Sequence, residues 1–174
     1  METTEVILKR RSIRKFQSQL IDNKILEEAI YYATQAPSAH NYQPWKFQIL
    51  NNEQKNQIAN ELIKKTSNLK DSTSPHTASI IKEAPNSILI YYDDNGENRD
   101  LNIISIGAAI ENMILYLEDK NIGTLWVGNT NYIKEEIKKI TKINLEPISM
   151  ILIGKKNQEP YQRPRKQFED IIIK

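Results

Sequence analysis

One long apolar segment limits what this chain can fold into more than any other feature of its sequence. Between residues 102 and 120, apolar side chains recur at helical spacing, which predicts a long helix. Its apolar face is formed by Ile103, Ile106, Ala109, Ile110, Met113, Ile114 and Leu117. Other elements have to cover so broad a face, so we expect this segment to be the central core helix.

Shorter segments with helical and extended patterns surround this helix. Helices are predicted at residues 4–10, 22–35, 53–66 and 131–141, with a helical turn at 77–83. Strands are predicted at residues 45–50, 87–92, 124–127 and 148–153, the last of them near the sheet centre. Asp22 is expected to cap the second helix, Gly123 to end the long helix, and residues 67–76 to form a loop. These patterns indicate an α+β or mixed α/β fold with a central mixed sheet of four to five strands, some of them parallel, flanked by helices.

The chain lacks several residue patterns on which common catalytic sites depend. It has no cysteine, which excludes disulfides, zinc fingers, iron–sulfur ligation and thiol catalysis. Its two histidines, His40 and His76, have no spacing typical of metal ligands, so we expect no metal site. The sequence also has no Gly-x-Ser-x-Gly elbow, Walker A loop or Gly-x-Gly-x-x-Gly fingerprint. Any enzymatic chemistry would therefore depend on a bound organic cofactor.

Length, hydropathy and charge narrow the class of protein further. The 174 residues suit a single domain, and the sequence holds no uninterrupted apolar run long enough to cross a membrane. The N-terminus lacks the apolar centre of a signal peptide, so we expect a cytoplasmic protein. The net charge of +2 is too small to indicate a protein that binds nucleic acid.

The arginines are distributed unevenly along the chain. Lysines outnumber arginines 18 to 6, yet five of the six arginines fall in two short clusters, at residues 10–14 and 163–165. The planar guanidinium group matches a phosphate or carboxylate in a way that the lysine ammonium does not. The clusters therefore indicate an anion-binding site, with surface ion pairing or a solvated basic turn as the alternative.

A second candidate segment joins a predicted helix to a predicted strand at residues 36–45. Pro37 and Pro44 fix a non-helical path, and small residues between them allow close approach of the backbone. Ser38, Asn41 and Gln43 offer hydrogen-bond donors and acceptors, and Trp45 offers a flat surface. The alternative is a structural loop with its tryptophan in the core.

Five segments together resemble the FMN-dependent nitroreductase family, of which the chain would be a small, single-domain member over residues 1–174. They are RRSIR at 10–14, PSAHNYQPW at 37–45, GAAIENM at 107–113, GTLWVG at 123–128 and RPRK at 163–166. The sequence departs from the family pattern at Glu111, where Gln is usual, and at Asn129, where a second Gly is common. The resemblance implies a nitroreductase-like fold and an interlocked homodimer with two FMN sites at the subunit interface.

The resemblance also implies which residues bind FMN. The phosphate and the polar side of the flavin would contact Arg10, Arg11, Ser12, Arg14, Arg163 and Arg165. The other subunit would contribute Pro37, Ser38, Ala39 and Asn41, and the flavin ring would lie beside the backbone of Val127, Gly128 and Asn129. The substrate pocket would include His40, Tyr42 and Trp126.

The activity implied by the family is NAD(P)H-dependent reduction of nitroaromatics, quinones or similar planar acceptors by a ping-pong mechanism. Alternatives are a specialised reduction on the same fold, such as enone reduction or dehalogenation, a flavin-binding redox sensor or storage protein, and a binding module for a phosphorylated metabolite. The apolar run 171–173 is expected to pair with a sheet edge, either its own or a partner's, because three isoleucines should not stay in water.

Overall fold

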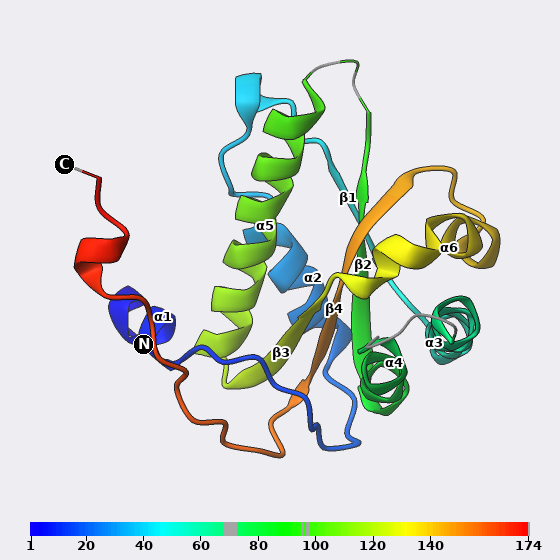
Figure 1. The fold of residues 1–174 in the computed structure, drawn as a ribbon, viewed down its shortest axis with the longest axis horizontal. Helices are drawn as coiled ribbons and strands as arrows, with labels where there is room; N and C mark the ends of the chain where they lie inside the picture. The colour runs from blue at the N-terminus through cyan, green and yellow to red at the C-terminus, as the bar shows by residue number, and fades with distance from the viewer. Residues whose placement is uncertain (68–72, 95, 97, 174) are drawn as a thin grey trace.

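The protein folds around a four-stranded sheet in the order β1-β2-β4-β3 (Figure 1). The computed structural model describes residues 1–174 apart from 68–72, 95, 97 and 174. The strands are β1 (Trp45–Ile49), β2 (Asn86–Tyr92), β3 (Ile122–Val127) and β4 (Glu146–Lys155). The predicted α+β class and four strands are confirmed, and β4 occupies a central position as predicted.

The pairing direction differs from the prediction, because every pair among these four strands is antiparallel. Parallel pairing occurs, within the described residues, only in an isolated bridge between Ser12 and Thr124. The reason is visible between β1 and β2, which are joined by two helices, α3 (Asn52–Thr66) and α4 (Ser74–Glu83). Two packed helices return the chain to the end of the sheet from which it left, so the next strand runs in the opposite direction.

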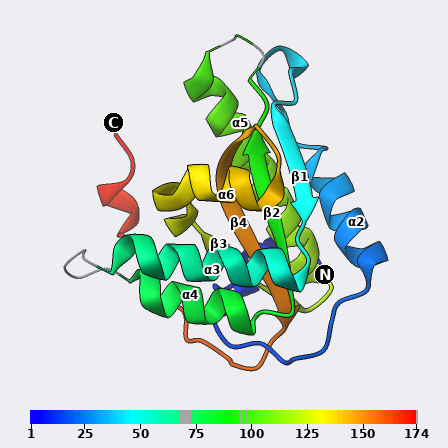
Figure 2. The same cartoon turned by 90° about the vertical axis from the view of Figure 1, so that its right-hand side faces the viewer.

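Helices cover both faces of the sheet (Figures 1 and 2). One face packs against α2 (Asn23–Ala33) and α5 (Arg99–Asp119), and the other packs against α3, α4 and α6 (Lys134–Thr141). Strand β2 is buried along its whole length, with alternate residues directed into the two cores. This burial on both sides explains why β2 and β4 have continuous apolar sequences rather than alternating ones.

The long helix α5 is the core helix, as predicted. Ile106, Ile110 and Met113 are fully buried between α2 and the sheet. Among the described residues, α5 is also the one helix whose length and apolar composition would suit a membrane span. Its first turns present Leu101 and Ile104 to the surface, and Ile104 remains 70% exposed.

Three predicted boundaries were wrong for local reasons. Gly123 does not end α5 but lies inside β3, because the helix stops at Asp119 and Asn121 takes up the left-handed conformation with φ of 58°. Helix α4 begins at Ser74 rather than residue 77, because Pro75 is compatible with a first helical turn. The predicted loop 67–76 is therefore shorter, and part of it falls outside the described residues. The predicted cap is confirmed, since the Asp22 side chain accepts from the Lys24 N–H.

The two ends of the chain meet beside the sheet. Helix α1 (Thr3–Lys9) is followed by an extended segment in which the Ile13 N–H donates to the Thr124 carbonyl at 2.8 Å. This close approach requires Gly123, because a Cβ there would lie 2.8 Å from Ile13 Cγ1. After β4, the Asn157 N–H donates to the Lys15 carbonyl at 3.0 Å, so the C-terminal tail starts along the same segment.

The tail then leaves the body of the protein and ends near a short 3-10 helix, η3 (Phe168–Asp170) (Figure 1). Ile171, Ile172 and Ile173 do not pair with the sheet that the described residues form, and Ile173 is 99% exposed. The first of the two predicted alternatives, a return to its own sheet edge, is therefore wrong.

Candidate functional site

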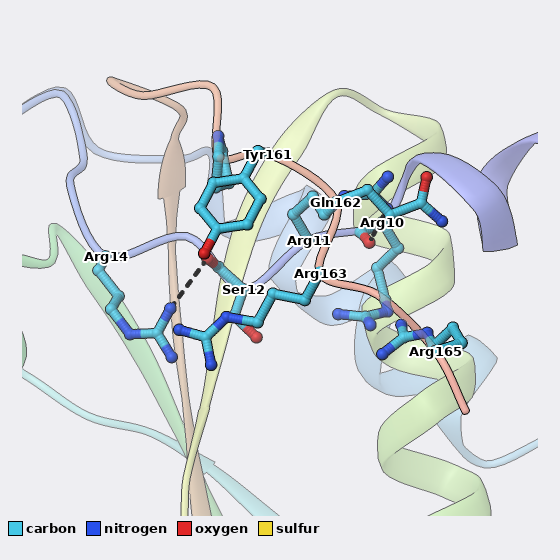
Figure 3. A pocket seen from close by; sticks show the side chains of 9 residues that line it. Arg10, Arg11, Ser12, Arg14, Tyr161, Gln162, Arg163 and Arg165 are labelled. Carbon is cyan, nitrogen blue, oxygen red and sulfur yellow. Dashed lines mark hydrogen bonds between the residues drawn. The ribbon is translucent and has the colours of Figure 1, made fainter. Parts of the chain in front are cut away.

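The two arginine clusters line one cavity of about 150 Å³ (Figure 3). The extended segment after α1 supplies one wall, and the tail after β4 supplies the other. The lining residues are Arg10, Arg11, Ser12, Arg14, Pro160, Tyr161, Gln162, Arg163 and Arg165. Residues from opposite ends of the sequence are thus brought together where both ends run beside β3 and β4.

Negative charge within the protein does little to offset these five guanidinium groups. Arg10 Nε lies 3.8 Å from Glu111 Oε1, and the Glu111 side chain is 48% exposed. Within the part of the chain that the structure describes, none of the other four arginines forms an ion pair. Cations gathered around one small cavity repel one another, so the arrangement favours an anionic ligand. The planar donor fork of arginine suits a phosphate in particular.

The arginines have different surroundings. Arg11 Nη1 donates to the carbonyls of Leu8 and Arg10 at 2.6 and 2.7 Å, so this nitrogen is turned toward the backbone. Arg14 Nη1 makes only a long contact of 3.5 Å with the Ser12 carbonyl. In Figure 3, the guanidinium groups of Arg14 and Arg163 lie toward one side of the cavity, and those of Arg10 and Arg165 toward the other. The guanidinium donors therefore approach the cavity from both sides.

The loop between α2 and β1 is strained. His40, Asn41 and Gln43 all have positive φ angles, of 49°, 58° and 50°. The Ser38 hydroxyl accepts from the Gln43 N–H at 3.0 Å, and the Ala39 N–H donates to the Ser105 hydroxyl at 3.3 Å. Non-glycine residues in this conformation are uncommon and gather at functional sites.

This loop does not reach the arginine cavity within one chain. It lies against the first half of α5, away from the end of that helix where α1 packs (Figure 1). The structure thus keeps Pro37, Ser38, Ala39 and Asn41 together on this loop, and none of them lines the arginine cavity. His40 and Tyr42 are exposed on the same loop, with ring centroids 5.4 Å apart. Trp45 is only 5% exposed, so the tryptophan at the end of this loop lies in the core rather than on the surface.

The residues predicted to lie beside the flavin ring, 127–129, are found at the end of β3, the strand that also pairs with the segment around Ser12. Val127 is buried, Gly128 is exposed, and Trp126 is 44% exposed. Asn129 Nδ2 donates to the Ser74 hydroxyl at 3.1 Å, which ties this segment to the start of α4. Gly128 lies four residues beyond Thr124, roughly 13 Å along an extended strand. Strand β3 therefore pairs with the arginine segment at Thr124 and leads directly into the backbone of residues 127–129.

Sequence reasoning missed three lining residues and one neighbour of the cavity. Pro160, Tyr161 and Gln162 line the cavity beside Arg163. Their position immediately before the second arginine cluster was a signal that could have identified them. Glu111 stood out only as a departure from the family pattern, and its proximity to Arg10 depends on the packing of α1 against α5.

Known proteins share both the sequence pattern and the fold. The sequence profile of the Nitroreductase family matches residues 7–155. A protein of Methanothermobacter thermautotrophicus, provisionally named NADH dehydrogenase/NAD(P)H nitroreductase, is 25% identical over 169 residues, which cover 94% of this chain and 82% of the relative.

Two solved structures show the same fold. A provisionally named nitroreductase from Desulfovibrio desulfuricans, solved in complex with FMN, has a TM-score of 0.86 and 19% identity, and the match covers 100% of this chain and 96% of that one. The NADPH:FMN oxidoreductase of Vibrio harveyi, complexed with NAD⁺, has a TM-score of 0.82 and 18% identity, with 99% and 76% of the two chains covered.

Proposed function

This chain belongs to the nitroreductase family, and we propose that it is an NAD(P)H-dependent flavin oxidoreductase that binds FMN within a single domain, residues 1–174. Its acceptors would be nitroaromatics, quinones or similar planar molecules, reduced by a ping-pong mechanism in which donor and acceptor use one pocket in turn. A cytoplasmic location is part of the same proposal.

The observation that carries this proposal is the arginine cavity. A phosphate monoester near neutral pH has a charge of about −1.5 to −2, and charge-assisted hydrogen bonds from several arginines would hold it. We assign Arg10, Ser12, Arg14, Arg163 and Arg165 to the phosphate and the polar side of the flavin. The pyrophosphate of FAD would favour a glycine-rich loop at a helix start, and the sequence has none.

The chemistry needs little from the side chains. Bound FMN supplies the capacity to accept a hydride and pass electrons on. The chain positions the flavin through its phosphate and presents the backbone of Val127, Gly128 and Asn129 along the ring. Backbone N–H groups fixed in this way stabilise negative charge without a titrating side chain. The link between Asn129 and Ser74 would keep this segment in place.

The proposal includes a homodimer in which each site draws on both subunits. The strained loop with Pro37, Ser38, Ala39 and Asn41 lies away from its own arginine cavity, so it would serve the partner's FMN. His40, Tyr42 and Trp126 would then line the acceptor pocket. The exposed isoleucines at 171–173 would lie on the partner's sheet edge, where each would gain roughly 1.5–3 kcal/mol from burial.

Cofactor identity and turnover can be tested on the purified protein. Flavin released by heat should co-elute with FMN on chromatography. Oxidation of NADH and NADPH should then be followed with and without a nitroaromatic or a quinone. Recovery of FAD, or no flavin after reconstitution, would refute the FMN assignment. Tight FMN binding without acceptor-dependent oxidation would refute the assignment of turnover and favour a sensor or storage role.

A further inference from the structure

Arg11 lines the arginine cavity, but its hydrogen bonds point to the backbone. Arg11 Nη1 donates to two carbonyls, those of Leu8 at 2.6 Å and Arg10 at 2.7 Å. Leu8 belongs to the last turn of α1, where carbonyls lack an intrahelical partner. A cation at a helix C-terminus also interacts favourably with the helix dipole. Arg11 therefore caps α1.

The residue that this cap fixes is Arg10. The Arg10 N–H makes the last bond of the helix, to the Val6 carbonyl at 2.9 Å, and its ψ of 129° then turns the chain out of the helix. The carbonyl of Arg10 accepts a hydrogen bond from the Arg11 side chain. The Arg10 backbone is thus held at both ends, which sets the direction in which its side chain leaves toward the cavity.

The chain after this point is anchored independently. The Ile13 N–H donates to the Thr124 carbonyl, and the Ile13 residue is only 1% exposed. Only residues 10–12 connect the end of α1 to this anchor, and the Arg11 side chain spans the first part of that connection. Loss of the Arg11 guanidinium would therefore loosen the helix end and Arg10 but leave Ile13 and β3 paired.

We infer that Arg11 is a positioning residue that acts through Arg10 and does not itself bind the phosphate. Both hydrogens of its Nη1 are used by carbonyls of the chain. Arg10, in contrast, forms a long ion pair with the half-exposed Glu111, at 3.8 Å. The phosphate part of this inference rests on the proposed function, whereas the cap on α1 does not.

A double-mutant cycle on FMN affinity separates positioning from direct binding. The variants are Arg10→Met, Arg11→Met and the double variant, with Arg11→Lys as a second, charge-retaining change. Each methionine variant should weaken FMN binding about tenfold or more while riboflavin, which lacks the phosphate, binds as in the wild type. Because Arg11 acts through Arg10, the double variant should bind FMN no more weakly than Arg10→Met alone. Additive losses would overturn the inference, since two independent phosphate ligands would give them.

Amide hydrogen exchange in the flavin-free protein tests the cap without any flavin. Arg11→Met should speed exchange of the Arg10 N–H by about 5- to 30-fold, the factor expected when a helix cap is lost. Arg10→Met, which leaves the Arg10 carbonyl in place, should not, and Arg11→Lys should restore part of the protection. Exchange unchanged in Arg11→Met would overturn the cap, and faster exchange with unchanged FMN affinity would overturn the link to Arg10. Absence of FMN binding by the wild type would refute the proposed function while leaving the exchange result valid.

Discussion

Substitution of Gly123 by alanine tests how the arginine segment is held in place. A Cβ at this position would lie 2.8 Å from Ile13 Cγ1 and 2.9 Å from Lys156 Cγ, closer than real side-chain contacts allow. Ile13 cannot withdraw easily, because it is buried and its N–H is bonded to Thr124. The added methyl group would therefore push the extended segment away from β3 and displace Ser12 and Arg14.

The size of the effect follows from two opposing contributions. Overpacking of this kind destabilises the folded protein by about 1–3 kcal/mol. Replacing glycine by alanine within a strand recovers about 0.5–1 kcal/mol of unfolded-state entropy. We expect Gly123→Ala to lower the free energy of unfolding by about 0.5–2 kcal/mol and to weaken FMN binding by about tenfold, the equivalent of one charged hydrogen bond.

Urea unfolding of the flavin-free protein and FMN titration would measure the two effects. Gly107→Ala is the matched control, because a Cβ at this helical glycine would meet nothing within 4 Å. Its stability should be unchanged or raised by up to about 1 kcal/mol, with FMN affinity unchanged. Combining Gly123→Ala with Ile13→Ala should cost less than the sum of the single changes, because the shorter side chain removes the closest contact. Wild-type stability and FMN affinity in Gly123→Ala would refute this account of the segment.

Four further outcomes are expected. Arg165→Ala should weaken FMN binding in fluorescence titrations by about 10- to 100-fold, because one charge-assisted hydrogen bond is lost. The control Lys15→Ala should bind FMN like the wild type, because Lys15 is exposed and does not line the cavity. Glu111→Gln should tighten FMN binding at low salt by up to about fivefold, because it removes a weak, solvent-screened competitor for Arg10, and equal affinities would exclude that competition. Burial and the hydrogen bond to Glu28 raise the pKa of Tyr116 to about 12, so the difference in 295 nm absorbance between wild type and Tyr116→Phe should titrate near pH 12. The contribution of the protonated Tyr116 to folding stability is complete below about pH 10, the pKa in the unfolded chain, and is lost as the pH rises toward 12. Titration of the absorbance difference near pH 10 would contradict this. Asn51→Ala should lower the free energy of unfolding by about 1 kcal/mol, because it removes the capping box of α3, and an unchanged urea midpoint would show that the box contributes nothing.

Local sequence patterns predicted those parts of the fold that depend on one segment at a time. The periodicity of α5 and the continuous apolar runs of β2 and β4 follow from burial, and the burial pattern of a single segment can be seen in its own sequence. Strand direction depends instead on how the connecting helices pack. The sequence predicted a helix at 53–66 and only a helical turn at 77–83, because the sequence near Pro75 reads equally well as a loop or as a first helical turn, so the packing of two full helices between β1 and β2 was not predicted.

The candidate site, too, could be predicted from the sequence only in part. The scarcity of arginine in a lysine-rich chain marked both clusters, and the structure places them around one cavity. The direction of each side chain could not be predicted, because Arg10 and Arg11 are adjacent and chemically identical. Only the turn at the end of α1 gives Arg11 two carbonyl partners and leaves Arg10 beside Glu111.

The cavity joins residues that lie near opposite ends of a 174-residue chain, and this has a consequence for the lifetime of the protein. A phosphate bound there would act as a non-covalent staple between the two termini. At a ligand concentration 100 times the Kd, binding adds about 2.7 kcal/mol to the folded state by mass action. Flavin supply would then control how often the tail comes loose and is exposed to proteases. The arginines that we propose as phosphate ligands would thus make the abundance of the protein follow the availability of flavin.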